Sequence, residues 1–220
     1  MNDMFDLEEK IICCRLCPRL VFWREEIARQ KRRAFRDQDY WGKPVPGFGD
    51  SKGHVMVIGL APGAHGSNRT GRMFTGDASG DFLYSALYNA GFANRFKAES
   101  INDGLILSDL FISAVCRCAP PGNKPDKIEM DTCQPYLQAE IELIQPLVYV
   151  ALGRIAFDRL IIIGSLQHHK WIFKHGACYQ IDEQHHLICS YHPSQQNTQT
   201  GRLTRYMFDG IWSEVNELLK

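Results

Sequence analysis

The chain has 220 residues, of which 45% are hydrophobic and 23% charged, and its formal net charge is zero. This composition is typical of a globular protein and excludes disordered, collagen-like and coiled-coil chains. No apolar run approaches the roughly 20 residues that a membrane-spanning helix needs, and no signal-peptide pattern opens the chain, so we expect a cytoplasmic protein.

The first part of the chain predicts two helices, a loop and a buried strand. We expect helices over residues 5–13 and 18–33, the second with Pro18 in its first turn. Residues 40–53 are rich in Gly, Pro and aromatic residues and predict a loop. The apolar run at 54–60 predicts a buried parallel strand that leads into a glycine-rich loop.

The remainder of the chain alternates helices and strands. Strands are expected over 105–115, over 148–152 and within 178–190. Helices are expected over 78–90, over 126–144 with a break near Pro135, over 154–163 and over 203–219. This alternation predicts an α/β fold with a mainly parallel sheet. In such sheets ligands bind beyond the carboxyl ends of the strands, where the polar loops of this chain fall.

The chain has eight cysteines, and in a reducing compartment clustered cysteines indicate metal binding or catalysis more than disulfides. Cys14 and Cys17 form a C-x₂-C pair, and Cys118 and Cys133 form a wider pair about 100 residues later. Four thiolates suit a zinc ion or a [4Fe–4S] cluster, and buried structural cysteines are the alternative. Other cysteines that could replace one of the four are Cys13, Cys116, Cys178 and Cys189.

The run from Gly59 to Asp77 is the most informative segment of the sequence. Its glycines allow the backbone to approach a ligand, and its amides and arginines can hold anionic groups. It contains no Walker or dinucleotide motif. Asp77 precedes a predicted helix and can act as an N-cap or as a functional carboxylate. Phe74 suits the core or an exposed stacking surface.

Two further segments carry candidate functional residues. His192 lies in Ser190–Ser194, directly after a predicted strand, and is a candidate catalytic histidine. The polar residues 195–202 suit contacts with sugar and phosphate. A basic run (Lys31, Arg32, Arg33 and Arg36) is typical of a solvated helix end.

Taken together, these segments resemble the family 5 (type b) uracil-DNA glycosylases, the iron–sulfur branch of the uracil-DNA glycosylase superfamily. The resemblance runs from about residue 14 to residue 205 and so covers nearly the whole chain. The matching pieces are the C-x₂-C at Cys14, the GLAPGAHGSNRTGR and FTGD runs at 59–77, RCAPP and NKP at 117–125, ALGRIA at 151–156, and SYHPS and QNTQTGRLTR at 190–205.

The resemblance implies one domain over residues 1–220, an α/β/α sandwich with a four-stranded, mainly parallel sheet. It implies a structural [4Fe–4S] cluster on Cys14, Cys17, Cys118 and Cys133, which ties the N-terminal helices to the rest. The implied activity is hydrolysis of the N-glycosidic bond of uracil in DNA, the first step of base excision repair. DNA with deaminated bases is then the partner; we expect a monomer, and a sliding clamp stays open as a further partner.

The resemblance also implies roles for individual residues. Base release leaves positive charge on the sugar and negative charge on the base, once the nucleotide is turned out of the duplex. Asp77 is then expected to stabilise the sugar cation and to position water, His192 to donate to the base oxygen, and Asn123 to assist. Phe74 is expected to stack on the base. The expected substrate-binding backbone is Gly59, Ala61, Gly63, Ala64 and His65, and the expected DNA contacts are Arg69, Arg72, Lys124, Asn197, Arg202 and Arg205.

Two absences bear on mechanism and specificity. The motif Leu60–Ala64 has no polar side chain of the kind many relatives carry, which favours Asp77 as the carboxylate. Family 4 enzymes place an asparagine before their cysteine–proline motif, where this chain has Ser113–Ala114–Val115. A pocket without a polar reader discriminates poorly, so hypoxanthine and xanthine are expected as further substrates.

Two other classes of protein are weighed against this interpretation. A non-enzymatic iron–sulfur regulator that binds DNA accounts for the cysteines and arginines, but gives no reason for Asp77 and His192 at strand ends, and no helix-turn-helix is evident. A hydrolase of free nucleotides or nucleosides accounts for a pocket but not for the polar loop at 195–202.

Overall fold

The computed structural model describes residues 3–220 and is built on one six-stranded sheet in the order β1-β3-β2-β4-β6-β5. The strands are β1 (Phe48–Gly49), β2 (Val55–Gly59), β3 (Leu110–Ala114), β4 (Val148–Leu152), β5 (Cys178–Gln180) and β6 (His186–Ser190). The four inner strands are parallel, and β1 and β5 pair antiparallel at the two edges. The predicted α/β fold with four parallel strands is confirmed, and the short edge strands are an addition to it.

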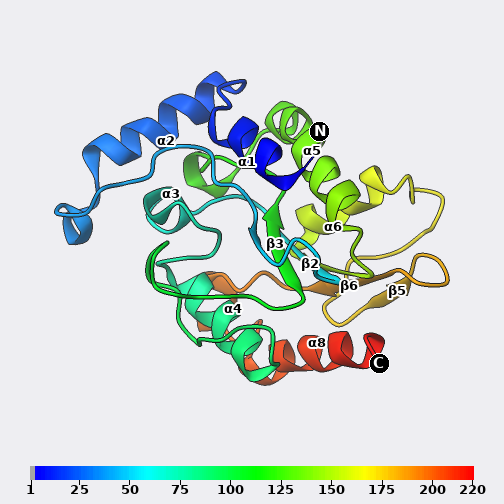
Figure 1. The fold of residues 1–220 in the computed structure, drawn as a ribbon. Coiled ribbons are helices and arrows are strands. Elements are labelled where there is room, and N and C mark those ends of the chain that lie inside the picture. Colours follow the sequence, from blue (N-terminus) through cyan, green and yellow to red (C-terminus); the bar gives the residue numbers. More distant parts are fainter. Residues whose placement is uncertain (1–2) are drawn as a thin grey trace.

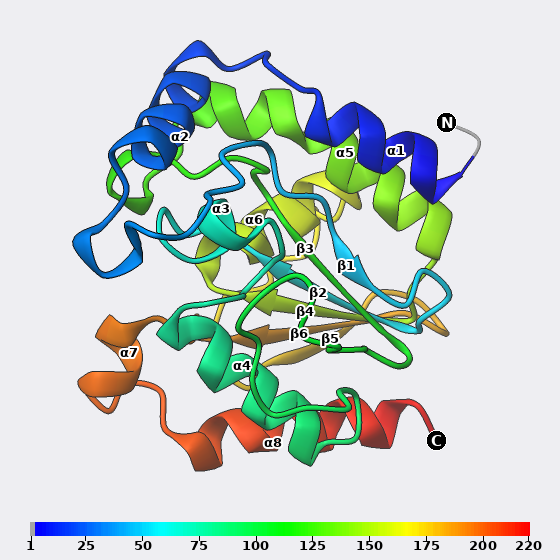
Figure 2. The same ribbon diagram turned by 60° about the vertical axis from the view of Figure 1, so that its left-hand side comes forward.

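Helices cover both faces of the sheet, which gives three layers (Figure 1). On one face lie α5 and α6, with α1 packed outside α5, while α4 and α8 cover the other face (Figure 2). The helices are α1 (Met4–Ile12), α2 (Pro18–Gln30), α3 (Ser67–Thr70), α4 (Ala78–Asn89), α5 (Lys127–Ile144), α6 (Arg154–Ile163), α7 (Gln195–Gln199) and α8 (Arg205–Leu218), with short 3₁₀ turns η1 (Arg33–Phe35) and η2 (Pro121–Asn123).

Each central strand supplies side chains to two cores because successive residues of a strand point to opposite faces. In β2, Val55 and Val57 enter the core beneath α4 and α8. Met56 and Ile58 enter the core beneath α5 and α6. All of these side chains are fully buried, which explains why β2 reads as a continuous apolar run rather than as alternating apolar and polar residues.

Several predicted elements differ from the structure, most of them by one or two residues at an end, and three differences have a clear physical cause. The expected strand at 105–115 is shortened to β3, because Asp109 has a positive φ of 58° that interrupts the extended run. The second helix ends at Gln30, because Lys31 leaves the helix with a φ of 54°. The expected break near Pro135 is wrong: α5 continues through this proline, with buried side chains both before and after it.

No helix within residues 3–220 is long and apolar enough to cross a membrane.

Candidate active site

A cavity of about 460 Å³ opens at the carboxyl edge of the parallel strands. Its walls come from the loops that follow β2, β3 and β6 and from the start of α4. The sheet topology therefore brings together segments that lie more than 100 residues apart in the chain, as expected for an open α/β sheet.

Asp77 lies at the start of α4 and faces this cavity. Its Oδ1 accepts a hydrogen bond from the backbone N–H of Gly80 at 3.0 Å, so Asp77 is an N-cap. Its Oδ2 lies against the loop after β2: a Cβ added to Gly66 would stand 2.0 Å from this oxygen, and one added to Gly63 would stand 2.9 Å from it. One oxygen thus caps the helix, and the other occupies space that the two glycines leave free.

The electrostatic environment of Asp77 makes it an unusual carboxylate. Burial raises the pKa of Asp77 above its usual range, and hydrogen bonds from the backbone N–H groups of Gly80 and Ser79 oppose this shift. A carboxylate whose pKa is raised by burial beside a cavity is a candidate functional residue, in addition to its role as an N-cap.

His192 and Phe74 line the same cavity. Their rings are stacked with centroids 5.8 Å apart and planes inclined by 28°. Phe74 has a positive φ of 51°, a strained conformation for a bulky residue and one that concentrates at functional sites. The carbonyl oxygen of His192 accepts a hydrogen bond from Nδ2 of Asn197 at 2.9 Å, so α7 fixes the loop that carries the histidine. Burial lowers the pKa of His192 to about 4, which leaves the imidazole neutral near pH 7.

The structure brings several other predicted residues to the cavity and leaves some outside it. Asn123 and Lys124, around η2, line the wall together with Gly59, Ala61 and Gly63. Ala64 and His65 do not line it. Instead, the Nδ1 of His65 is 3.0 Å from the hydroxyl of Tyr40, in the loop after α2.

Arg69 and Arg72, predicted to contact DNA, are buried and hydrogen-bonded within the protein. Arg69 donates to the carbonyls of His65 and Gly76, and its guanidinium lies 4.0 Å from the ring of Phe35. Arg72 pairs with Asp103 at 2.7 Å. The expectation that both residues contact DNA is therefore wrong, because their N–H donors are bound within the protein and are not available to a phosphate. They stabilise the loop between β2 and α4 instead.

The remaining predicted DNA contacts are not buried ion-pair partners of this kind. Arg202 is exposed, with its guanidinium 4.7 Å from the ring of Tyr191, and Arg205 is exposed, 4.4 Å from the ring of Phe82. Both arginines keep donors available to a ligand. The side chain of Asn197 is committed to the His192 loop, so its contribution in this structure is to position that loop.

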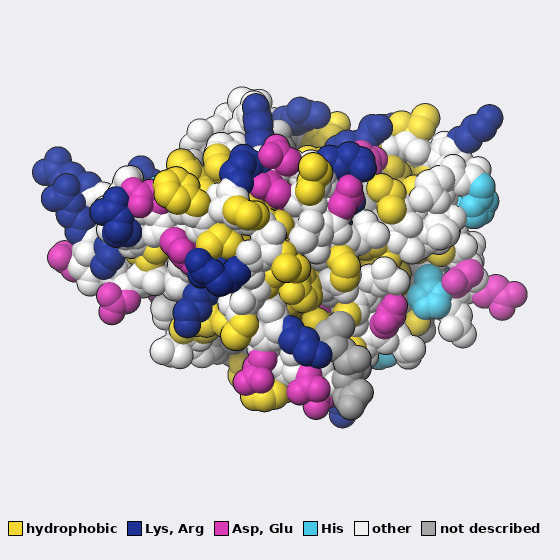
Figure 3. Space-filling model, turned by 90° about the horizontal axis from the view of Figure 1, so that it is seen from above, with side chains coloured by type: hydrophobic (Ala, Val, Ile, Leu, Met, Phe, Trp, Pro, Cys, Tyr) yellow, Lys and Arg dark blue, Asp and Glu magenta, His cyan; other side chains and the backbone are white. Residues whose placement is uncertain are grey.

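The basic run at 31–36, taken from the sequence as a solvated helix end, gains significance in the structure. Lys and Arg side chains gather at the end of the molecule formed by the loop after α2, on the left in Figure 3. The segment that carries this basic tip (Lys31, Arg32, Arg33 and Arg36) packs against the loop between β2 and α4 through the Phe35–Arg69 and Tyr40–His65 contacts. It projects on the same side of the sheet as α3 and α7, as Figure 2 shows.

Cys14, Cys17, Cys118 and Cys133 line one small pocket between the start of α2, the loop after β3 and α5. The other cysteines, Cys13, Cys116, Cys178 and Cys189, do not line it. Two N–H groups point at its sulfurs: Nη1 of Arg24 donates to Sγ of Cys118 at 2.9 Å, and the backbone N–H of Arg117 donates to Sγ of Cys133 at 3.4 Å. Such donors suit sulfur ligands that carry negative charge.

Four thiols in one pocket suit a zinc ion or an iron–sulfur cluster. Within residues 3–220, no three or more His, Cys, Asp or Glu side chains form a group that could hold a metal ion as they stand.

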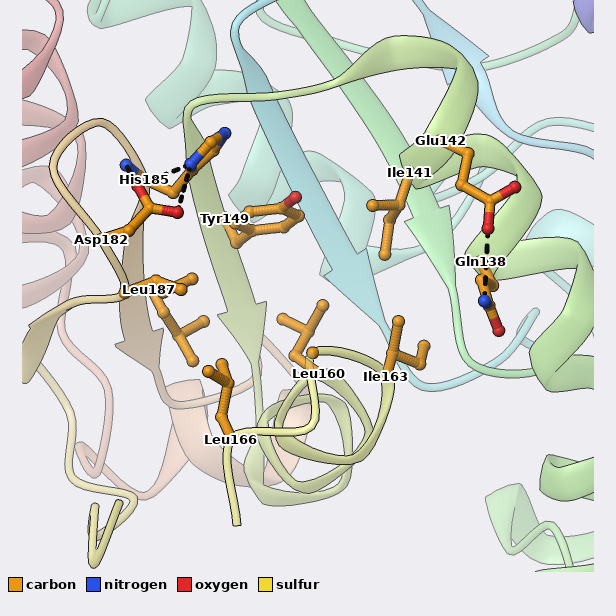
Figure 4. A pocket seen from close by; sticks show the side chains of 12 residues that line it. Gln138, Ile141, Glu142, Tyr149, Leu160, Ile163, Leu166, Asp182, His185 and Leu187 are labelled. Atoms are coloured by element: carbon orange, nitrogen blue, oxygen red, sulfur yellow. Dashed lines mark hydrogen bonds and ion pairs between the residues drawn. The ribbon is translucent and has the colours of Figure 1, made fainter. Parts of the chain in front are cut away.

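A second cavity, of about 310 Å³, lies near the opposite, amino-terminal edge of the sheet (Figure 4). Its walls are largely apolar and include Tyr149, Leu160 and Leu187. Asp182 and His185, which also line it, hydrogen-bond to each other at 2.7 Å. The predicted residues Asp77 and His192 line the cavity at the carboxyl edge and not this one, so we take the carboxyl-edge cavity as the candidate active site.

Comparison with known proteins points to one family. A family model described as the uracil DNA glycosylase superfamily matches residues 46–216. The chain is 51% identical to a type-5 uracil-DNA glycosylase of Thermus thermophilus, over 96% of this chain and 95% of that one. It is 49% identical to a type-5 enzyme of Mycobacterium leprae, over 97% and 94% of the two chains. A type-5 enzyme of Pyrobaculum aerophilum is 41% identical, over 90% and 86%.

The lowered pKa of His192 predicts a loss of stability in acid. The unfolded chain takes up a proton near pH 6.5 that the folded chain resists down to about pH 4. The free energy of unfolding should therefore fall as pH drops from 6.5 to 4, by no more than about 3 kcal/mol. The measurement is chemical denaturation of wild type and His192→Asn at pH 7 and pH 4.5, with exposed His168→Asn as control. The wild-type advantage over His192→Asn should shrink in acid; an equal difference at both pH values contradicts the prediction.

Proposed function

Because the chain belongs to the uracil-DNA glycosylase superfamily, we propose that it hydrolyses the N-glycosidic bond of uracil in DNA and so initiates base excision repair. The observation that carries this proposal is the cavity in which the buried carboxylate of Asp77 and the neutral imidazole of His192 line the same space. The enzyme is then a uracil-DNA glycosylase. Its relatives have this name, and their similarity to this chain extends over nearly their full length.

The cavity supports a dissociative cleavage. A base inside a duplex shields its glycosidic bond, so the nucleotide must first turn out of the helix into the cavity. The C1′–N1 bond of uracil then breaks, and its electron pair leaves with the base. Positive charge develops on the sugar, and ionised Asp77 stabilises it at close range. Water adds to C1′ and passes its proton to Asp77, while the uracil anion takes a proton from solvent.

His192 is suited to stabilise the departing base. A neutral imidazole can donate one N–H to the developing oxyanion of uracil without first losing a proton. The hydrogen bond from Asn197 to the carbonyl of His192 holds the loop in place before the substrate arrives. Preorganised donors of this kind typically contribute 10²- to 10³-fold in rate. Phe74, stacked on the imidazole, presents an apolar surface for the flipped base.

Asn123 completes the proposed catalytic group. It lies on the cavity wall in a left-handed conformation with φ of 57°, directly after Gly122, which has φ of 58°. Asparagine tolerates this conformation better than most residues. Its amide can hold the attacking water beside Asp77, and the backbone of Gly59, Ala61 and Gly63 completes the pocket.

The base pocket lacks a polar side chain from the end of β3. Ala114 lines the cavity there, and the hydroxyl of neighbouring Ser113 is turned away and donates to the carboxylate of Glu140 at 2.5 Å. Neither residue can read the edge of a base. We propose that hypoxanthine and xanthine are accepted beside uracil, because a pocket rejects poorly where it makes no specific hydrogen bond.

We propose that Cys14, Cys17, Cys118 and Cys133 hold a [4Fe–4S] cluster, supported by their common pocket and by the two N–H donors aimed at its sulfurs. When bound, the cluster supplies a cross-link between the start of α2, the loop after β3 and α5. A structural role is favoured because none of the four cysteines lines the catalytic cavity.

Removing the carboxylate of Asp77 tests the proposed mechanism. We expect Asp77→Asn to lose at least about 10³-fold in single-turnover uracil release, since the sugar cation loses its counter-charge. Asparagine keeps an oxygen for the N-cap, so the melting temperature should change little. DNA affinity should be retained. Uracil release at the wild-type rate would reduce Asp77 to its capping role.

A polar side chain at Ala114 should restore discrimination. We expect wild type to release both hypoxanthine and uracil, and Ala114→Asn to raise the uracil-to-hypoxanthine rate ratio by at least about tenfold. The ratio is independent of any general loss of stability, and Ala114→Ser serves as a size control. A wild-type enzyme that releases uracil but not hypoxanthine contradicts the proposed specificity.

The basic tip predicts a second set of phosphate contacts. Neutralising Arg33 and Arg36 to Gln should reduce the slope of log affinity against log salt by about 2, at roughly 0.9 per phosphate contact. The control neutralises Lys52 and Lys220, which lie toward the amino-terminal edge of the sheet. DNA affinity is measured by fluorescence anisotropy. Equal slopes for wild type and the Arg33/Arg36 variant would mean that the basic tip does not contact phosphates and is only a solvated helix end.

A further inference from the structure

Arg24, in the middle of α2, is a buried arginine with an unusual set of partners. Its side chain is only 2% exposed, and a buried guanidinium requires negative or strongly polar acceptors. The carboxylate of Glu25 lies 3.8 Å away, but that group is exposed and already bound by Arg15. The charge of Arg24 must therefore be balanced mainly from inside the protein.

The acceptors that Arg24 finds belong to the cysteine pocket. Its Nη1 donates to Sγ of Cys118 at 2.9 Å, and its Nη2 donates to the carbonyl oxygen of Cys14 at 3.2 Å. A cysteine that binds a metal does so as a thiolate, so a cluster ligand at Cys118 supplies the negative charge that this guanidinium lacks. The side chain of Arg24 thus contacts two of the four proposed ligand residues.

The backbone of the same residue contacts the loop between β2 and α4, which carries cavity residues and is called the catalytic loop below. Nδ2 of Asn68, a fully buried residue of α3, donates to the carbonyl oxygen of Arg24 at 3.2 Å. The backbone N–H of Asn68 in turn donates to the carbonyl of Gly63 at 3.0 Å. Gly63 lies on the cavity wall beside Asp77. A continuous series of hydrogen bonds therefore runs from the Cys118 sulfur to the wall of the active site.

We propose that Arg24 is a positioning residue with two functions: its guanidinium stabilises the Cys118 ligand of the cluster, and its carbonyl anchors the catalytic loop through Asn68. This inference rests on the proposed [4Fe–4S] cluster. The cluster would then be connected to the active site in two ways. One is the series of contacts through Arg24 and Asn68, and the other is the loop after β3, which carries both Cys118 and the cavity residue Asn123.

The two functions are separable by substitution. Arg24→Gln removes the charge while its backbone carbonyl remains, and Arg24→Lys keeps the charge with fewer donors. Asn68→Ala removes the anchor and leaves the cysteine pocket intact. Arg29→Gln, an exposed arginine on the same helix that pairs with Glu26, is the matched control. Each full-length protein is purified without oxygen and assayed for iron and sulfide, for visible absorbance and its decay in air, and for uracil release per loaded cluster.

We expect Arg24→Gln to lose its visible absorbance in air several-fold faster than wild type, Arg24→Lys to lie between the two, and Arg29→Gln to match wild type. Asn68→Ala should keep wild-type absorbance and decay while kcat for uracil release falls about tenfold or more, because the loop loses its alignment. The folded fraction is checked by circular dichroism, and Arg24→Lys carries the test where Arg24→Gln does not fold.

Three results would overturn the inference in distinguishable ways. Equal decay of absorbance in wild type, Arg24→Gln and Arg24→Lys removes the role of the guanidinium. A wild-type kcat in Asn68→Ala removes the anchor. If the wild-type protein contains no iron or sulfide, both the proposed cluster and this inference are wrong. Uracil release by that same protein would still test the proposed glycosylase activity independently.

Discussion

The close packing of the Asp77 carboxylate against the loop after β2 is the constraint on which the active site depends. The carboxylate can lie there because Gly63 and Gly66 have no side chains: a Cβ on Gly66 would stand 2.0 Å from Oδ2. This contact fixes the start of α4 relative to the end of β2, and the N-cap bond to Gly80 orients the carboxylate. Burial in the same place raises its pKa, so one packing arrangement sets both its position and its acid–base chemistry.

The supports of this loop lie outside the cavity and are largely ionic or polar. Two arginines of the loop itself stabilise it: Arg69 donates to the carbonyl of Gly76, and Arg72 forms a buried ion pair with Asp103. Asn68 attaches it to α2, whose Arg24 contacts the cysteine pocket. Most polar groups of this network are hydrogen-bonded, which favours one arrangement of the backbone, although Nε of Arg24 and Oδ1 of Asn68 are buried without a hydrogen-bond partner in the described part of the chain. The cysteine pocket and the active site are therefore parts of one framework around the carboxyl edge of the sheet.

Much of this arrangement is predictable from the sequence, because it depends on local patterns. The apolar run at 54–60 predicts β2, and the position of Asp77 before a helical segment predicts its cap. The internal partners of Arg69 and Arg72 are not predictable in this way. Gln38, which binds Arg69, and Asp103, which binds Arg72, each lie 31 residues away in the chain, and only the fold brings them together. His65 is directed to Tyr40 rather than to the cavity by a contact of the same long-range kind. Pro135 interrupts a local pattern, yet tertiary packing on both sides of it maintains α5.

The most direct test of this account is the reaction of the cluster-loaded protein with a duplex oligonucleotide that contains one uracil. We predict free uracil in solution and an intact abasic strand that breaks only on later treatment with alkali, since water is the nucleophile and no lyase step is involved. Binding of the duplex with every base still attached would contradict the account and would favour a regulator that binds DNA without cleaving it.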